Sequence, residues 1–170
     1  KDLDFKYGIA CFVRNSLKNK FIEATTLIDL EKKWNDYSGR FAGGAVLAIG
    51  VENFTIINVH GLWQGSIKTD TEAKIEQSEK IINFANKIEG RKIICGDFNL
   101  LPETKSIQII RDKYRDLIQE YNITDTRGSL YPKKLRYSDY IFTDKNITIN
   151  NFSVPNLNIS DHLPLLLDFK

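Results

Sequence analysis

Apolar residues gather along the chain in short blocks whose length is typical of β-strands. The first half of the chain has blocks of this kind at Tyr7–Val13, Ala45–Val51, Phe54–His60 and Arg91–Gly96. The second and third blocks flank the short turn Glu52-Asn53, which predicts a β-hairpin. Three more strands are predicted near the C-terminus, at Ser138–Thr143, Ile147–Ser153 and Pro164–Phe169.

Helical spacing replaces this pattern in two places. The segment Thr69-Asp70-Thr71-Glu72 has the form of a capping box, and apolar or small residues then recur every three or four positions up to Ile88, with Gly90 ending the helix. A second helical zone is predicted over Thr104 to Tyr121, with a break near Asp112. Strands and helices interleave without strict βαβ repetition, which favours an α/β fold with a mixed sheet.

Composition narrows the class of protein. The chain has 170 residues, of which 42% are hydrophobic and 27% charged, a balance typical of one globular domain over residues 1–170. No apolar run approaches the roughly 20 residues that a membrane helix needs. The net charge of +2 is too small for a strongly basic polyanion-binding arm. Cys11 and Cys95 lie in apolar stretches without zinc-site spacing, so we expect two buried free thiols and a cytoplasmic setting.

Polar residues with catalytic potential cluster where the predicted strands end or begin. His60 ends one strand, Asp97 and Asn99 follow another, and Asp161 and His162 precede the last, while Asp139 lies inside an otherwise apolar strand. Each has a plain structural alternative, because Asp and Asn favour turns and a single histidine is often only packed and hydrogen-bonded. A buried carboxylate needs a partner, however, and a histidine oriented by an Asp is a common general base.

Three motifs, taken in order, resemble the endonuclease/exonuclease/phosphatase superfamily, the DNase I-like group. They are Gly96-Asp97-Phe98-Asn99, Tyr137-Ser138-Asp139-Tyr140-Ile141-Phe142 and Ser160-Asp161-His162-Leu163-Pro164-Leu165, and Asn58-Val59-His60 matches a further family position. The resemblance implies a sandwich of two mixed β-sheets flanked by helices. It also implies a metal-dependent phosphodiesterase that uses Mg²⁺ or Mn²⁺, a choice that fits hard oxygen ligands.

The resemblance also implies a role for each residue. His162 is the general base or stabilises the attacked phosphate, and Asp139 orients it. Asp97 positions the attacking water with Asn99 beside it, His60 contacts phosphate, and Asp161 is a metal ligand. In-line attack on a phosphodiester needs such a positioned water, a base and cations that neutralise the developing charge.

The start of the chain departs from the family pattern. The strand that ends in a Gln-Glu pair is missing, and with it the Glu that is the family's principal metal ligand; Glu23, Glu31 and Glu52 stand in the wrong context. We therefore expect a domain without its N-terminal strands, either a fragment, which the intact motifs favour, or a natural short form. We also expect an exposed edge at Tyr7–Val13 that a partner chain or self-association covers.

The substrate is the least determined part. The run Lys133, Lys134 and Arg136 is either a solvated loop or a phosphate-backbone contact, with Arg127 nearby; Asn58 and Trp63 are further candidate contacts, although Trp63 could equally be packed. We expect a nuclease acting on DNA or RNA. A phosphatase or lipid phosphodiesterase with a smaller substrate, and a catalytically incomplete fragment that binds phosphorylated ligands, remain alternatives.

Overall fold

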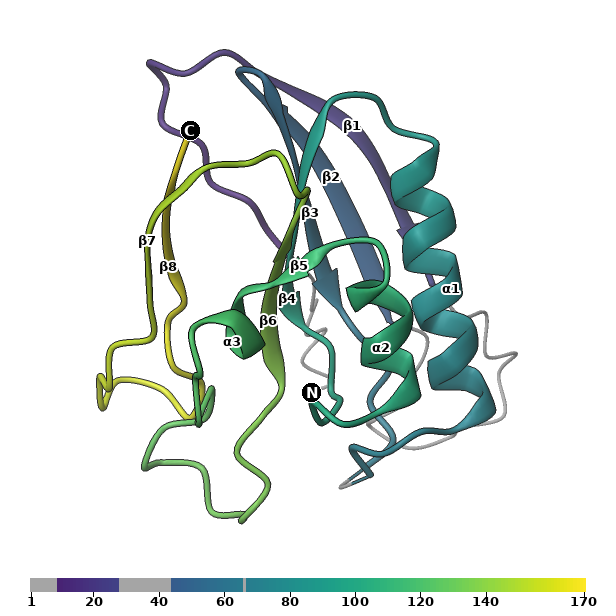
Figure 1. Cartoon of the computed structure of the whole chain (residues 1–170), viewed down its shortest axis with the longest axis vertical. Coiled ribbons are helices and arrows are strands. Elements are labelled where there is room, and N and C mark those ends of the chain that lie inside the picture. The colour runs from purple at the N-terminus through teal and green to yellow at the C-terminus, as the bar shows by residue number, and fades with distance from the viewer. Residues whose placement is uncertain (1–8, 28–43, 66) are drawn as a thin grey trace, which may run out of the picture.

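The computed structural model describes residues 9–27, 44–65 and 67–170, and its strands build a layered α/β structure (Figure 1). Within those residues, a six-stranded sheet has the order β1-β2-β3-β4-β6-β5, and a two-stranded sheet pairs β7 with β8. The strands are β1 (Asn19–Thr26), β2 (Ala45–Val51), β3 (Phe54–His60), β4 (Arg91–Asp97), β5 (Arg115–Asp116), β6 (Asp139–Thr143), β7 (Ile149–Ser153) and β8 (Leu166–Phe169). Among these described strands, β3 and β4 pair in parallel and the other neighbours pair antiparallel, so the large sheet is mixed as predicted.

Two helices cover one face of the large sheet, and the β7–β8 sheet lies on the other side (Figure 1). They are α1 (Glu72–Asn86) and α2 (Lys105–Arg111), while the short α3 (Leu117–Glu120) follows β5. The core between sheet and helices is apolar, with Ile57, Ile81, Ile94 and Ile107 fully buried. On the opposite face Phe54 of β3 packs edge-on against Phe169 of β8, with ring centroids 4.8 Å apart.

The predicted hairpin and the predicted break between the helices are confirmed. β2 and β3 pair antiparallel around a turn in which Glu52 has a positive φ of 51°. α2 ends at the C-cap Asp112, and β5 and α3 follow it. The capping box was wrong in its detail, because Thr71 rather than Thr69 is the N-cap and accepts from the Lys74 backbone N–H. Asp70 instead binds the first turn of α2.

The first predicted strand was wrong. Tyr7 and Gly8 lie outside the described residues, and residues 9–13 are not in a strand. The exposed edge expected at Tyr7–Val13 is therefore absent from the described residues, and the strand at that end of the sheet is β1, which pairs with β2. The side chains of β1 are mostly exposed, and for that reason its sequence has no apolar block that would predict a strand. Glu31 also lies outside the described residues.

Residues 10–14 line a cavity of about 620 Å³ together with β2, β3 and Phe169. Cys11 and Cys95 line the same cavity and are free, as predicted, but they are half-buried rather than buried. Desolvation raises the pKa of the Cys95 thiol to about 12. Desolvation also raises the pKa of the Cys11 thiol, so both thiols stay protonated at neutral pH. No helix among the described residues is long and apolar enough to cross a membrane.

Candidate active site

The site begins with one row of residues that crosses three strands of the large sheet. His60 at the end of β3 pairs with Asp97 at the end of β4, and Asp97 pairs with Asp139 at the start of β6. Paired residues on neighbouring strands point their side chains to the same face. All three are half-buried, on the face that carries Phe54 and the β7–β8 sheet. The sheet itself therefore places a histidine and two carboxylates side by side.

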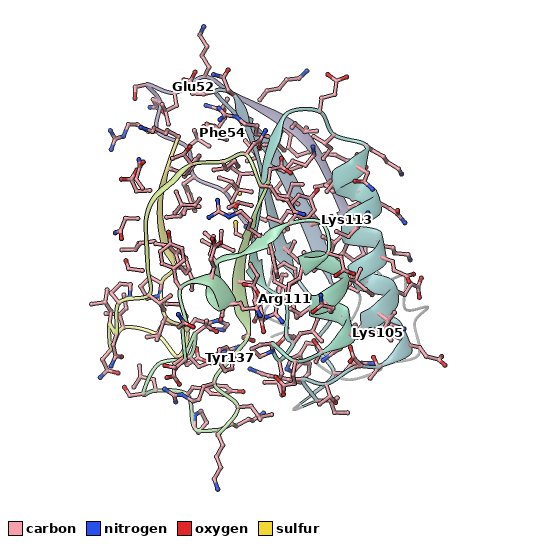
Figure 2. All side chains as sticks on the ribbon, viewed as in Figure 1. Glu52, Phe54, Lys105, Arg111, Lys113 and Tyr137 are labelled. Carbon is pink, nitrogen blue, oxygen red and sulfur yellow. The ribbon has the colours of Figure 1, made fainter. Side chains whose placement is uncertain are left out.

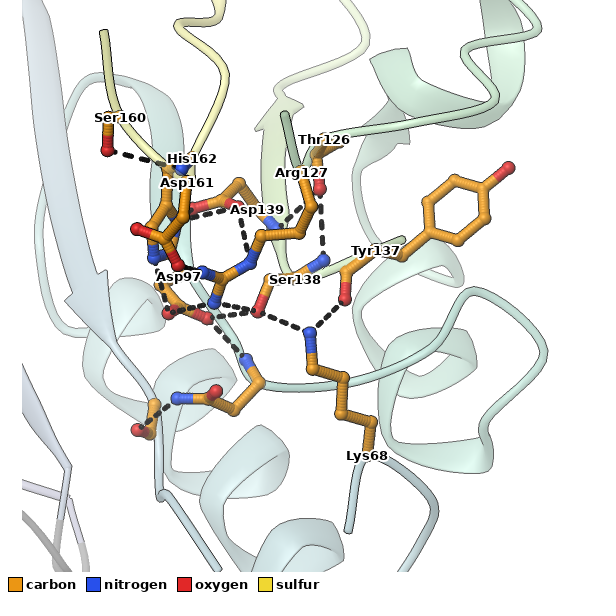
Figure 3. A network of polar contacts seen from close by, with 12 residues as sticks. Lys68, Asp97, Thr126, Arg127, Tyr137, Ser138, Asp139, Ser160, Asp161 and His162 are labelled. Atoms are coloured by element: carbon orange, nitrogen blue, oxygen red, sulfur yellow. Dashed lines mark hydrogen bonds and ion pairs between the residues drawn. The ribbon is translucent and has the colours of Figure 1, made fainter. Parts of the chain in front are cut away.

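His162 joins this row from the loop before β8. A backbone bridge between Arg127 and His162 seats the loop, and Leu163 N–H donates to the Thr126 carbonyl at 3.0 Å. The imidazole Nδ1 lies 2.9 and 3.0 Å from the two oxygens of Asp139, and Nε2 lies 3.8 Å from Asp97 Oδ2 (Figure 3). The predicted pairing of His162 with Asp139 is present in the structure.

The electrostatics of this pair follow from burial and contact. Burial opposes the charged imidazole, but the hydrogen bond and charge of Asp139 outweigh it and raise the pKa of His162 above its usual value. Burial likewise raises the pKa of the Asp139 carboxyl, while the hydrogen bond to His162 opposes that rise. The charged imidazole of His162 is therefore favoured by its contact with Asp139.

Arg127 lies at the centre of the acidic residues. Its guanidinium is 2.7 Å from Asp161 Oδ2, 3.4 Å from Asp97 Oδ2 and 4.0 Å from Asp139 Oδ2. The residue is only 6% exposed. Figure 3 shows the guanidinium enclosed by these carboxylates and by Ser138. Arg127 thus compensates three like charges inside the site, a role different from the open backbone contact expected from the sequence.

The orientation of Asp97 is held by its neighbours. Asp97 Oδ1 accepts from the Ser138 hydroxyl at 2.8 Å and from the Asn99 backbone N–H at 2.8 Å. Asn99 is 5% exposed, has a positive φ of 53° and donates its side-chain amide to the Gly61 carbonyl. Gly96 has a φ of 131°, and a Cβ there would lie 2.0 Å from the Val59 carbonyl oxygen, so only glycine fits before Asp97.

Two buried lysines support the site, and sequence reasoning missed both. Lys68 Nζ donates to the Tyr137 carbonyl at 2.7 Å and to Ser138 Oγ at 3.2 Å. Lys74 of α1 donates to the carbonyls of Ile67 and Asn99. Desolvation lowers the pKa of each to about 8. Their polar sequence surroundings predict solvated side chains, so only the tertiary fold shows that they brace the loops around Asp97.

Comparison with known families identifies the chain. Residues 5–162 match the endonuclease/exonuclease/phosphatase family. The chain belongs to this family. Its members are phosphoester hydrolases, and the match confirms the resemblance stated from the three sequence motifs. No curated protein sequence matches significantly.

Solved structures share the family fold. An endonuclease/exonuclease/phosphatase from Bacteroides vulgatus superposes with a TM-score of 0.66 at 17% identity, over 92% of this chain and 67% of that one. A mannosyl-6-phosphatase from Bacteroides thetaiotaomicron gives a TM-score of 0.65 at 16% identity, over 92% and 68%. D. rerio TDP2, complexed with a single-strand DNA product, gives 0.61 at 14%, over 93% and 70%. The chain thus spans about two thirds of the length of these family members.

The family's use of divalent cations can be tested against the residues present. Among the described residues, donor atoms of Asp97, Asp139 and His162 lie within 4.8 Å of one another. Carboxylate oxygens suit Mg²⁺ or Mn²⁺, whereas imidazole is a softer ligand. Asp161, the metal ligand implied by the resemblance, is 46% exposed and pairs with Arg127 instead. The donor atoms that lie together are thus those of Asp97, Asp139 and His162, and the two carboxylates among them suit a hard cation.

The remaining residues predicted to contact substrate lie outside the cluster of carboxylates around Arg127. Asn58 lies on the same face as His60 but donates to the Ala10 carbonyl and lines the cavity near Cys11. Trp63 is 40% exposed on the loop after β3. Lys133 and Lys134 are exposed on the loop before β6, whereas Arg136 is half-buried and bound to Asp125 at 2.9 Å. Of the basic run, the two lysines are thus exposed to solvent, whereas the arginine is held in an ion pair.

Proposed function

We propose that this family member is a divalent-cation-dependent phosphodiesterase that cleaves nucleic acid. The observation that carries the proposal is the contact of His162 Nδ1 with Asp139 while Nε2 faces Asp97 Oδ2 at 3.8 Å. Because the Asp139 carboxylate accepts the Nδ1 proton, Nε2 is left to exchange a proton with a water or phosphate oxygen beside Asp97. A bound Mg²⁺ or Mn²⁺ would supply charge stabilisation for the attacked phosphate.

The surroundings of the site support a nucleic-acid substrate. The guanidinium of Arg127 and the Lys68 ammonium lie 4.6 and 4.9 Å from the centroid of the Tyr131 ring. Lys133 and Lys134 are exposed two and three residues further along the same loop, and Trp63 is exposed on another. Aromatic rings and lysines together suit base stacking and backbone contact with a single strand. Small phosphorylated headgroups would need fewer such contacts.

The test is a substrate panel with Mg²⁺ or Mn²⁺ and with EDTA. Plasmid, abasic duplex, single-stranded DNA, RNA, inositol phosphates and sphingomyelin are incubated with the wild type, with His162→Ala and with Lys80→Ala. Lys80 pairs with Glu76 on the exposed face of α1, so Lys80→Ala serves as the control. We expect EDTA and His162→Ala to reduce cleavage of nucleic acid by at least about 100-fold, because a general acid–base group contributes about 10²–10⁴-fold.

Each other result selects an alternative. Cleavage confined to the inositol phosphates or sphingomyelin would replace the nuclease proposal with a phosphatase or lipid phosphodiesterase. Binding of these ligands without turnover would favour a catalytically incomplete fragment, and turnover that appears on adding upstream residues would support that interpretation. Equal rates for wild type and His162→Ala would remove His162 from the chemistry.

A further inference from the structure

The Ser138 hydroxyl lies within hydrogen-bond distance of two cationic side chains and one carboxylate. Lys68 Nζ lies 3.2 Å and Arg127 Nη2 lies 3.1 Å from Ser138 Oγ, and Oγ lies 2.8 Å from Asp97 Oδ1 (Figure 3). Ser138 is 0% exposed and Lys68 is 5% exposed, so water does not compete for these contacts. The hydroxyl is therefore shared among protein groups alone.

The direction of each hydrogen bond follows from the chemistry of the groups. Ammonium and guanidinium groups can only donate, and a hydroxyl has two acceptor sites and one proton. Lys68 and Arg127 together occupy both acceptor sites of Ser138 Oγ. The Ser138 proton must then be donated to Asp97 Oδ1. Lys68 thus helps to hold the Ser138 hydroxyl in the position from which it donates to Asp97.

This bond decides how the Asp97 carboxylate faces the site. Oδ1 accepts from Ser138 and from the Asn99 backbone N–H, so it is held by two donors. Oδ2 is the oxygen that lies 3.8 Å from His162 Nε2. Fixing Oδ1 therefore leaves Oδ2 directed at the imidazole, where the reacting oxygen of a phosphoester would be bound.

Lys68 is itself rigidly placed. Its ammonium donates to the Tyr137 carbonyl at 2.7 Å, and its backbone carbonyl accepts from Leu101 N–H at 2.9 Å. The residue thereby joins the loop after β3 to the residue before Ser138 and to the segment after Asn99. A side chain anchored at both ends can hold a partner group with little motion.

We propose that Lys68 is a positioning residue that acts through the Ser138 hydroxyl to orient Asp97 for phosphoester hydrolysis. The inference rests on the proposed function of the site. A misplacement of about 1 Å in a catalytic group can cost about 100-fold in rate. We therefore expect Lys68 to affect kcat much more than KM, since neither Lys68 nor Ser138 is required to touch the substrate.

The test is a double-mutant cycle with Lys68→Met and Ser138→Ala. We expect each single variant to lower kcat by about 10- to 100-fold, with KM changed less than about 3-fold, and the double variant to be no slower than the slower single variant. Lys80→Met is the matched control. We expect it to keep the wild-type kcat, and its combination with Ser138→Ala to have the same kcat as Ser138→Ala alone. A purely structural role would lower stability without this non-additivity in kcat.

In the kinetic data, the inference is overturned by a kcat of Lys68→Met within about 2-fold of wild type, or by fully multiplicative losses in the double variant. Thermal unfolding of the wild type, the two single variants and the Lys68→Met/Ser138→Ala double variant is also measured without substrate. If the wild type hydrolyses no phosphoester, the proposed function fails, and the unfolding data then decide the contact itself. Less-than-additive shifts in Tm support the coupling of Lys68 to Ser138, and additive shifts overturn it.

Discussion

At the scale of the residue, the contact of His162 with Asp139 determines which ring nitrogen is left for proton exchange in the proposed hydrolysis. An ionised carboxylate only accepts hydrogen bonds, so Nδ1 carries the proton and Nε2 faces Asp97. Arg127 limits the repulsion among Asp97, Asp139 and Asp161. The acidic residues can therefore stay close together, which is the arrangement that a phosphoester site requires.

Asp139→Asn tests this arrangement through the pH–rate profile. The Asp139 carboxylate raises the pKa of His162, so its loss lowers that pKa. Activity that requires a neutral imidazole rises as pH increases through the His162 pKa, and we expect this limb to move to lower pH in the variant, together with a fall in kcat. Glu76→Gln, on the exposed face of α1, is the control and should keep the wild-type profile. A limb that stays in place or moves to higher pH would contradict the pairing.

The site residues differ in how well sequence alone could identify them. Asp97, Asp139 and His162 lie in ordered motifs beside strand blocks, and the structure brings them together. Lys68 could not be found, because a lysine in a polar loop carries no periodic signal and its partners are 69 and 70 residues away. Arg127 was identified as a residue near the site, but its burial among three carboxylates depends on tertiary packing.

At the scale of the element, Asp70 connects the start of α1 to the start of α2. Its carboxylate accepts from the backbone N–H groups of Lys105 and Ser106 at 2.8 and 3.0 Å and from the Ser106 hydroxyl at 2.6 Å. N–H groups in the first turn of a helix have no intrahelical partner, so this carboxylate satisfies two of them. The bond also holds the loop that carries Lys68.

Asp70→Asn should weaken this connection in a pH-dependent way. Partial burial raises the pKa of Asp70, but hydrogen bonds from Ser106 and Lys105 outweigh it and hold the pKa below its ordinary value. The stabilisation is then present above an ordinary Asp pKa of about 3.9 and is lost as pH falls through the lower folded-state value. We expect the variant to lose about 1 kcal/mol of unfolding free energy at pH 7, and less near pH 3.

Chemical denaturation across pH measures this effect. Glu76→Gln again serves as the control, because an exposed helix pair contributes little. A loss that is equal at pH 7 and pH 3 would show that the Asp70 charge is not responsible.

The element pattern was predicted best where strands are apolar. β2, β3, β4 and β6 coincide with apolar blocks because they are central strands of the large sheet. β1 was not predicted, since it is mostly exposed and is held by backbone pairing with β2. Residues 9–13 form no strand, and residues 10–13 line a cavity instead, so the apolar block was correctly recognised but wrongly assigned to a strand.

At the scale of the molecule, charge is spread without a strong excess. The net charge is only +2. The hairpin turn at Glu52 lies at the opposite end of the molecule from Tyr137 and the site, so charges near that turn are far from the substrate (Figure 2). A protein with few lysines beside its site should bind single-stranded DNA weakly, with a salt dependence set by those few charges. The exposed Lys133 and Lys134 are the residues expected to supply this attraction.

The double variant Lys133→Ala/Lys134→Ala tests the attraction. Each phosphate contact on a single strand contributes about 0.7 to the slope of log K against log salt, so we expect the slope to become shallower by about 1.4 and KM to rise with kcat unchanged. Binding of labelled single-stranded DNA at several salt concentrations measures it. Lys18→Ala/Lys20→Ala, near the Glu52 turn, should leave the slope unchanged. An unchanged slope in Lys133→Ala/Lys134→Ala would show that these two lysines are solvated and do not contact the DNA backbone.

The cross-strand row of His60, Asp97 and Asp139 has one more consequence. Its spacing is set by backbone pairing within the sheet, while Trp63, Tyr131 and the two open lysines are on loops. Insertions or exchanges in those loops can alter which molecule is accepted and leave the reactive geometry intact. Such a division makes the scaffold well suited to divergence in selectivity, and a grafted loop from a relative would be a direct way to redirect it.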